Sequence, residues 1–199
     1  MHLSLSVHQR YSSTQSVENT LYILRGVRMI LKKAEHITEI EKLNLEAFPA
    51  EEQIPVCDLV RMAQQDNYAV LAAYEEERFI GFAFLAVNKP SVYLFLLAVS
   101  APLRSKGYGG KIVQSVCRFY PGCQLVVDIQ RTDVPCDNLP QRLKRREFYL
   151  RSGFHPTNRY LQFNGMDFEL LCSSPTFNER AFKGVLENMQ ANGFLLQVR

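Results

Sequence analysis

A buried apolar stretch runs directly into a glycine-rich loop, and this junction limits the folds that the chain can adopt. Residues 91–99 read SVYLFLLAV, a run of apolar residues that predicts a strand. Residues 111–119 then place apolar side chains on one helical face, which predicts an amphipathic helix. The loop between them carries two cations and three glycines: Arg104, Lys106, Gly107, Gly109 and Gly110. This order predicts an anion-binding turn, because successive N–H groups at a helix start and the helix dipole favour negative charge.

Apolar patterns elsewhere in the chain predict the other elements. We expect strands at 30–31, two in 68–87, and one each at 91–99, 124–129, 157–163 and 166–172. We expect helices at 37–48, after Pro55, after the glycine loop, at 139–152 and at 176–190. The order β, α, α, β, β, β, α, β, α, β, β predicts an α/β (α+β) fold with about six to seven strands flanked by helices.

Composition is that of an ordinary globular chain and excludes several classes of function. The 199 residues are 47% apolar and 22% charged, which fits one domain, and the net charge of +3 fits a small anionic ligand better than nucleic acid or a membrane. Five cysteines without a CxxC pair predict neither a disulfide framework nor a metal site. Residues 1–27 lack the features of a signal peptide, so a reducing cytoplasm is the expected location.

Two common phosphate-binding motifs do not fit the loop. Counting from Gly110 and Lys111, a Walker A loop would need glycine at Ser105 and Ser or Thr at Ile112. A dinucleotide fingerprint would need its third glycine at Ile112 and a loop without the seven residues 100–106. Spacing therefore argues against both nucleotide-binding classes.

The pattern Arg104-x-x-Gly107-x-Gly109-Gly110 resembles the pyrophosphate loop of the GNAT superfamily, which are acyl-CoA-dependent N-acetyltransferases. The loop of that superfamily has the pattern (Gln/Arg)-x-x-Gly-x-(Gly/Ala) between a strand and a helix. A second match follows about 40 residues later, where Tyr149, Gly153 and Phe154 fit the Tyr-x-x-x-Gly-Phe motif of the same superfamily. Two motifs in the right order are more specific than one, and the chain resembles an uncharacterised bacterial member.

The resemblance implies a mixed, mostly antiparallel central sheet with a splayed parallel strand pair at the cofactor cleft. It implies a division into an N-terminal extension at 1–28, an acetyltransferase domain at 29–173 and a C-terminal helical appendage at 174–199. The apolar stripe of the last helix predicts packing on the domain, and a possible homodimer through this stripe stays open.

The resemblance also implies acetyl-CoA as co-substrate and assigns roles to residues. Cofactor binding is expected at Leu97, Ala98, Val99, Arg104, Ser105, Lys106, Gly107, Tyr108, Gly109 and Gly110. Tyr149 is expected to protonate the leaving thiolate, although a tyrosine beside Phe148 and Leu150 is also typical of a packing residue. An asparagine of the superfamily would fall on Arg142, while Asn138 lies eleven residues before Tyr149.

The general base departs from the pattern of the superfamily, because the strand at 91–99 lacks the glutamate that the superfamily often places there. Asp128 in the next strand is the first candidate, and Glu51 and Glu52 are the alternatives. No Cys/His pair is spaced for an acyl-enzyme, so direct transfer is expected. The predicted function is therefore acetyl transfer to a primary amine of a small molecule or peptide. The alternatives are a catalytically silent acyl-CoA-binding or regulatory module and, from the arginines of 139–152, nucleic-acid binding.

Overall fold

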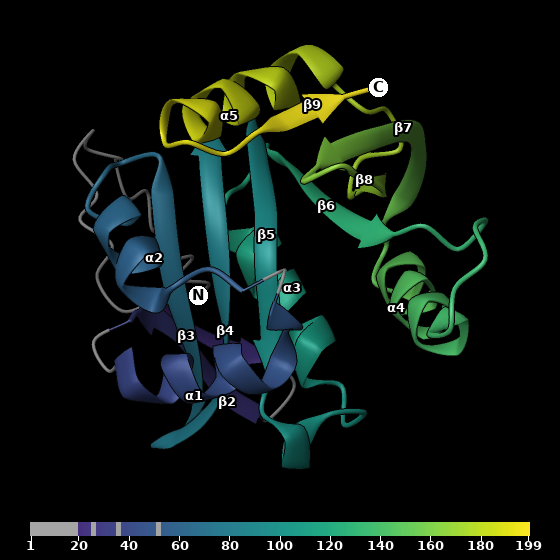
Figure 1. Ribbon diagram of the computed structural model, residues 1–199. Helices are drawn as coiled ribbons and strands as arrows, with labels where there is room; N and C mark the ends of the chain where they lie inside the picture. Colours follow the sequence, from purple (N-terminus) through teal and green to yellow (C-terminus); the bar gives the residue numbers. More distant parts are fainter. Residues whose placement is uncertain (1–19, 25–26, 35–36, 51–52) are drawn as a thin grey trace, which may run out of the picture.

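A nine-stranded mixed sheet, in the order β1-β2-β3-β4-β5-β6-β8-β7-β9, organises the computed structural model of the chain (Figure 1). The structure describes residues 20–24, 27–34, 37–50 and 53–199. The strands are β1 Thr20–Leu24, β2 Val27–Lys33, β3 Tyr68–Glu75, β4 Arg78–Asn88, β5 Ser91–Val99, β6 Gln124–Gln130, β7 His155–Phe163, β8 Met166–Cys172 and β9 Leu196–Val198. The helices are α1 Ile37–Ala47, α2 Val56–Met62, α3 Tyr108–Phe119, α4 Leu139–Arg151 and α5 Glu179–Ala191, with a short 3₁₀ turn at Ala101–Leu103.

The predicted fold class is confirmed. Adjacent strands pair antiparallel throughout the described sheet except β5 and β6, which are parallel. The seven expected strands are present, and β1 and β9 extend the sheet at its two edges. β1 falls in the expected extension, of which residues 1–19 and 25–26 lie outside the described part, and β9 falls in the expected appendage. The division of the chain at residues 28 and 173 stays a prediction.

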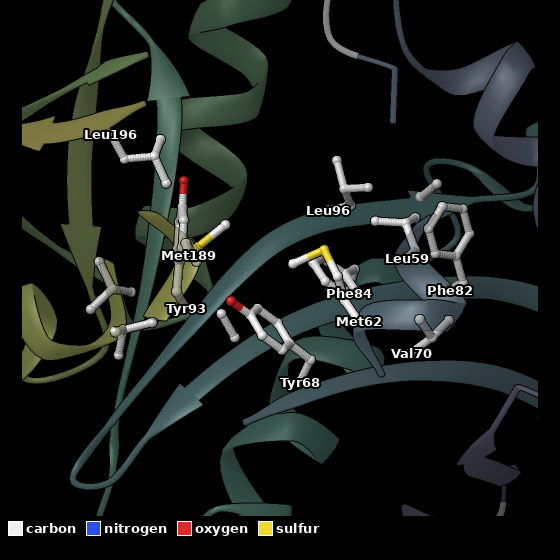
Figure 2. Packing of buried hydrophobic residues seen from close by; sticks show 14 of the residues in the cluster. Leu59, Met62, Tyr68, Val70, Phe82, Phe84, Tyr93, Leu96, Met189 and Leu196 are labelled. Atoms are coloured by element: carbon white, nitrogen blue, oxygen red, sulfur yellow. The ribbon is translucent and has the colours of Figure 1, made fainter. Parts of the chain in front are cut away.

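Helices cover both faces of the sheet and create two apolar cores. α1, α2 and α5 pack on one face, and α3 and α4 on the other. β4 shows why, since Phe82 and Phe84 face the first core while Ala83 and Leu85 face the second. Figure 2 shows Tyr68 and Phe84 together in the first core, where their rings stack with centroids 5.8 Å apart. A sheet buried on both faces explains the nearly continuous apolar runs of its central strands.

The apolar stripe of α5 packs inside the molecule, as its sequence predicts. Four of its residues are buried in the first core: Phe182, Val185, Leu186 and Met189. α5 lies across β4 and β5, and its first turn is capped by Asn178, whose side chain accepts a hydrogen bond from the Ala181 N–H at 3.0 Å. A homodimer through this stripe would have to displace that packing, so dimerisation stays a prediction without support from this face.

The parallel pair β5–β6 opens after three residue pairs. Ser91, Val92 and Tyr93 pair with β6, and beyond them the two strands spread apart (Figure 1). A bulge in β5 lies just past this point, because Leu94 pairs with Leu85 and Leu96 pairs with Phe84, which leaves Phe95 as the extra residue. Main-chain groups of a bulged residue fall outside the regular ladder, so the opening is lined by backbone as well as side chains.

Candidate active site

The end of β5, the glycine-rich loop and α4 enclose a cleft of about 640 Å³. Eight of the ten predicted cofactor residues line it: Leu97, Ala98, Val99, Arg104, Ser105, Gly107, Gly109 and Gly110. The structure therefore brings together the strand end and the loop that the sequence placed side by side. Lys106 and Tyr108 are not among its described lining residues.

The loop presents the start of α3 to this cleft. Gly107 is the N-cap of α3 and has a φ of 83°, in the left-handed region that favours glycine. Gly109 lies against α4, because a Cβ there would come within 3.2 Å of the Phe148 ring. The first N–H groups of any α-helix have no partner within the helix, and here Gly109 and Gly110 lie at the cleft. The geometry is that of an anion cradle built from main-chain donors.

Two of the predicted side chains hold the loop in place instead of pointing freely into the cleft. The Arg104 guanidinium donates to the Val99 carbonyl oxygen at 2.9 Å and pairs with Glu46 Oε1 of α1 at 2.7 Å. The Tyr108 hydroxyl donates to Glu75 Oε2 of β3 at 2.6 Å. Tyr108 therefore reaches away toward β3, and only its main chain remains near the start of α3.

The arginines of the basic helix α4 fall into two groups: two make hydrogen bonds to other parts of the protein, and two line the cleft. Arg146 makes two hydrogen bonds to the Glu169 carboxylate, at 2.9 and 3.0 Å, and fastens α4 to β8. Arg142 donates to Asn138 Oδ1 at 2.7 Å and to the Arg131 carbonyl at 2.9 Å. Two other arginines of α4, Arg145 and Arg151, line the cleft. The sequence showed a basic run but could not show which of its members face the cleft.

Tyr149 lies at the boundary between this cleft and a second, inner pocket of about 90 Å³. Tyr149, Leu97 and Arg145 line both cavities. The side chain is buried, and its ring makes edge-to-face contacts with Phe148 and Phe154. Burial raises the pKa of the Tyr149 hydroxyl well above its ordinary value; Arg145 lowers it in part, and Asp128 adds to the rise. Tyr149 therefore stays protonated at neutral pH, and its hydroxyl keeps a proton to donate.

Asp128 lines the same inner pocket from β6, the strand next to β5. Its Oδ1 atom accepts a hydrogen bond of 2.6 Å from the hydroxyl of Tyr93, a residue on β5. Tyr93 is fully buried, and both its burial and the neighbouring Asp128 charge raise the pKa of the Tyr93 hydroxyl. Asp128, the first candidate base, and Tyr149 therefore line the same pocket. Glu51 and Glu52, the alternatives, lie outside the described residues.

Comparison with known families matches residues 36–154, more than half of the chain, to the acetyltransferase (GNAT) family. The chain belongs to this GNAT acetyltransferase family. The family match includes the glycine loop, Asp128 and Tyr149. Both candidate catalytic residues of this GNAT chain therefore lie in the matched region. The recognised family and the class of enzyme, an acyltransferase, are those that the two sequence motifs predicted. A search of curated proteins finds no significant match.

Solved structures similar to this GNAT chain support the fold. An acetyltransferase assigned to the GNAT family from Bacteroides thetaiotaomicron is 22% identical, with a TM-score of 0.64 over 80% of this chain and 94% of that one. The ribosomal-protein-S18-alanine N-acetyltransferase of Escherichia coli is 13% identical, with a TM-score of 0.55 over 75% and 95%. An acetyltransferase of Bacillus subtilis in complex with CoA is 17% identical, with a TM-score of 0.52 over 73% and 97%.

The described residues contain neither a membrane-spanning helix nor a cluster of metal ligands. No helix there is long and apolar enough to cross a membrane. Within the same ranges, no group of three or more His, Cys, Asp or Glu side chains is placed to hold a metal ion.

Proposed function

We propose that this GNAT enzyme binds acetyl-CoA in the larger cleft and transfers the acetyl group to a primary amine in the inner pocket. Members of the family use acetyl-CoA, and the cleft fits its charged part. Main-chain N–H groups at Gly109 and Gly110 would hold the pyrophosphate, and Arg145 and Arg151 would add positive charge. The groups of Leu97, Ala98 and Val99 would hold the pantetheine arm, since these residues line the same cleft.

Asp128 is the proposed general base. An amine with an ordinary pKa near 10 is mostly protonated at neutral pH, so a proton must leave before the nitrogen can attack. Asp128 lines the pocket where the amine would lie, and the Tyr93 hydroxyl fixes the orientation of its carboxylate. Asp128 would take the place of the acidic residue that β5 lacks. The lack of that residue was the reason for considering the catalytically silent alternative.

Tyr149 is the proposed donor to the departing sulfur. Its raised pKa keeps the phenol intact, and its place between the two cavities puts it where the thioester would lie. The negative oxygen that forms during attack would be held by main-chain N–H groups of β5 near the bulge at Phe95. The acetyl group would pass directly from sulfur to nitrogen. Asp128 would take one proton from the ammonium group before attack, and the N–C bond would then form as the C–S bond breaks. Tyr149 would give a proton to the departing sulfur, and the second proton lost by the nitrogen would restore the Tyr149 hydroxyl.

One observation carries this proposal: Tyr149 lines both the larger cleft, which the glycine loop also lines, and the inner pocket, which contains the carboxylate of Asp128. The two reactants of an acetyl transfer need adjoining sites of these two chemical kinds. A nucleic-acid role for α4 receives less support, since Arg142 and Arg146 are engaged within the molecule.

The test is release of coenzyme A thiol when the purified protein is given acetyl-CoA and a panel of primary amines. We expect Tyr149→Phe to lower kcat by about tenfold to a hundredfold, because it removes one donor to the leaving group. Its dissociation constant for coenzyme A, measured by calorimetry, should change less than about twofold. Tyr120→Phe, at the far end of α3, is the matched control and should keep native turnover.

Two results would contradict the proposal in different ways. Binding of acetyl-CoA without thiol release for any amine would favour the silent acyl-CoA-binding module. Absence of any binding to acetyl-CoA or coenzyme A would remove the assignment of the cleft itself.

A further inference from the structure

Phenylalanine side chains make up a large part of the lining of the inner pocket. Four phenylalanines from separate parts of the chain meet there: Phe48 after α1, Phe95 at the β5 bulge, Phe163 at the end of β7 and Phe168 on β8. Three of these rings are only partly buried, although each packs on another aromatic ring. Apolar side chains that are left partly open at a cavity provide a surface for an apolar ligand group.

Charge in the pocket argues against acceptors with several amines. Asp128 is the one carboxylate among its described lining residues, and the guanidinium of Arg145 lines the same pocket. Within the inner pocket, a second ammonium group on the acceptor would meet Arg145 or the phenylalanines and would lose its hydration without gaining a carboxylate partner there. A single ammonium, in contrast, has Asp128 as its partner.

From these two features we infer that the acceptor has a single primary amino group and that this amino group is attached to a small aliphatic group. This inference rests on the proposed acetyl transfer and names the acceptor class of the same site. The volume of about 90 Å³ limits the size of that group. An apolar cavity of about 150 Å³ is known to bind benzene, so the inner pocket fits a branched chain of a few carbons better than an aromatic ring.

The source of such an amine is either a free aliphatic amine or the first residue of a peptide with a leucine-like side chain. Gln130 and Phe168 line both the inner pocket and a neighbouring pocket of about 270 Å³, which Arg131 and Asp167 also line. The remainder of a longer acceptor would lie in this second, more polar pocket. Comparing 3-methylbutylamine with leucinamide and with leucyl-glycyl-glycine separates the two sources.

The main experiment compares kcat/KM of the native enzyme for four amines at saturating acetyl-CoA. We expect 3-methylbutylamine to exceed ethanolamine by about tenfold or more, because each buried methylene adds to transition-state binding. Spermidine should be the poorest substrate, and phenethylamine should fall below 3-methylbutylamine. Equal or better use of spermidine or ethanolamine would overturn the inference while leaving acetyl transfer intact.

A variant tests whether the pocket wall sets this order. Phe163→Ala removes one ring, so kcat/KM for phenethylamine should rise relative to 3-methylbutylamine by about fivefold or more, a gain that a damaged fold would not give. Phe119→Ala, a half-buried ring on α3 that lines neither cavity, should leave the ratio unchanged. An unchanged ratio in Phe163→Ala would overturn the assignment of the pocket.

Binding measurements separate failure of this inference from failure of the proposed function. Calorimetry in the presence of coenzyme A should show 3-methylbutylamine binding more tightly than spermidine. If the apolar amine binds in this way but no amine is acetylated, acetyl transfer is wrong, and the pocket is a binding site for apolar amines without an acceptor. If neither binding nor turnover shows the preference, the inference is overturned.

Discussion

Tyr149 combines a packing position in the second core with the position that the proposed chemistry requires. Its ring packs with Phe148 and Phe154 in the second core, while its position also borders both cavities. A sequence can show that a tyrosine lies on an apolar helix face, but not that its edge meets a cavity. The packing interpretation and the functional interpretation of Tyr149 are therefore compatible.

The raised pKa of Tyr149 predicts a dependence of stability on alkaline pH. The folded-state pKa lies above the unfolded value of about 10, so below pH 10 both states keep the proton. As pH rises further, the unfolded chain ionises first, and the free energy of unfolding falls by up to about 1.4 kcal/mol per pH unit for each such tyrosine. Urea unfolding of the native protein and Tyr149→Phe should therefore show a shallower decline in the variant, because Tyr93 alone of this buried pair remains. Parallel declines would contradict the prediction.

Gly107 and Gly110 form a matched pair for testing the loop. A Cβ at either position has no atom within 4 Å, but only Gly107 has a positive φ. Gly107→Ala should therefore lower the free energy of unfolding by about 1 kcal/mol. Gly110→Ala should raise it by about 0.5 to 1 kcal/mol, since alanine favours the helix. Denaturant unfolding measures both effects, and a stabilised Gly107→Ala would contradict the assigned loop conformation.

At the scale of elements, local sequence patterns predicted the longer strands and helices. They did not predict the short strand or the hydrogen bonds that form only when distant segments come together. The runs at 91–99 and 124–129 appear as β5 and β6, and the helix at 139–152 appears as α4. β9 has only three residues, Leu196–Val198, and exists because it pairs with β7, so no local pattern could identify it. The Tyr93–Asp128 hydrogen bond joins residues 35 positions apart, and the Arg104–Glu46 pair joins residues 58 apart. Such contacts follow from the sheet order.

Helix α5 should be essential to the folded molecule, because its stripe completes the first core. Phe182 is fully buried and its ring lies 5.4 Å from the Tyr93 ring, edge to face. Phe182→Ala should lower the free energy of unfolding by about 3 to 5 kcal/mol. Lys183→Ala, one residue on and exposed, should cost less than about 0.5 kcal/mol despite its ion pair with Glu179. Similar midpoints of urea unfolding for the two variants would mean that α5 is a dispensable appendage.

At the scale of the whole molecule, helices cover both faces of the described sheet, and the parallel strands β5 and β6 part beyond Tyr93. The residues of the inner pocket come from positions 48 to 168, so the pocket depends on the complete arrangement of strands. The glycine loop and the tyrosine motif could be read from the sequence because each is short and continuous. The group of four phenylalanines that lines the inner pocket could not be read in this way, because these residues are far apart in the sequence and the chain has nine other phenylalanines.

The two cavities lie next to each other and share three lining residues, Leu97, Arg145 and Tyr149. If the proposed function is right, a donor in the larger cleft and an acceptor in the smaller pocket would be bound at the same time, next to these shared residues. Initial rates measured against both reactants should therefore give intersecting reciprocal plots, the sign of a ternary complex, and the enzyme has no need to carry a covalent acetyl group between two half-reactions.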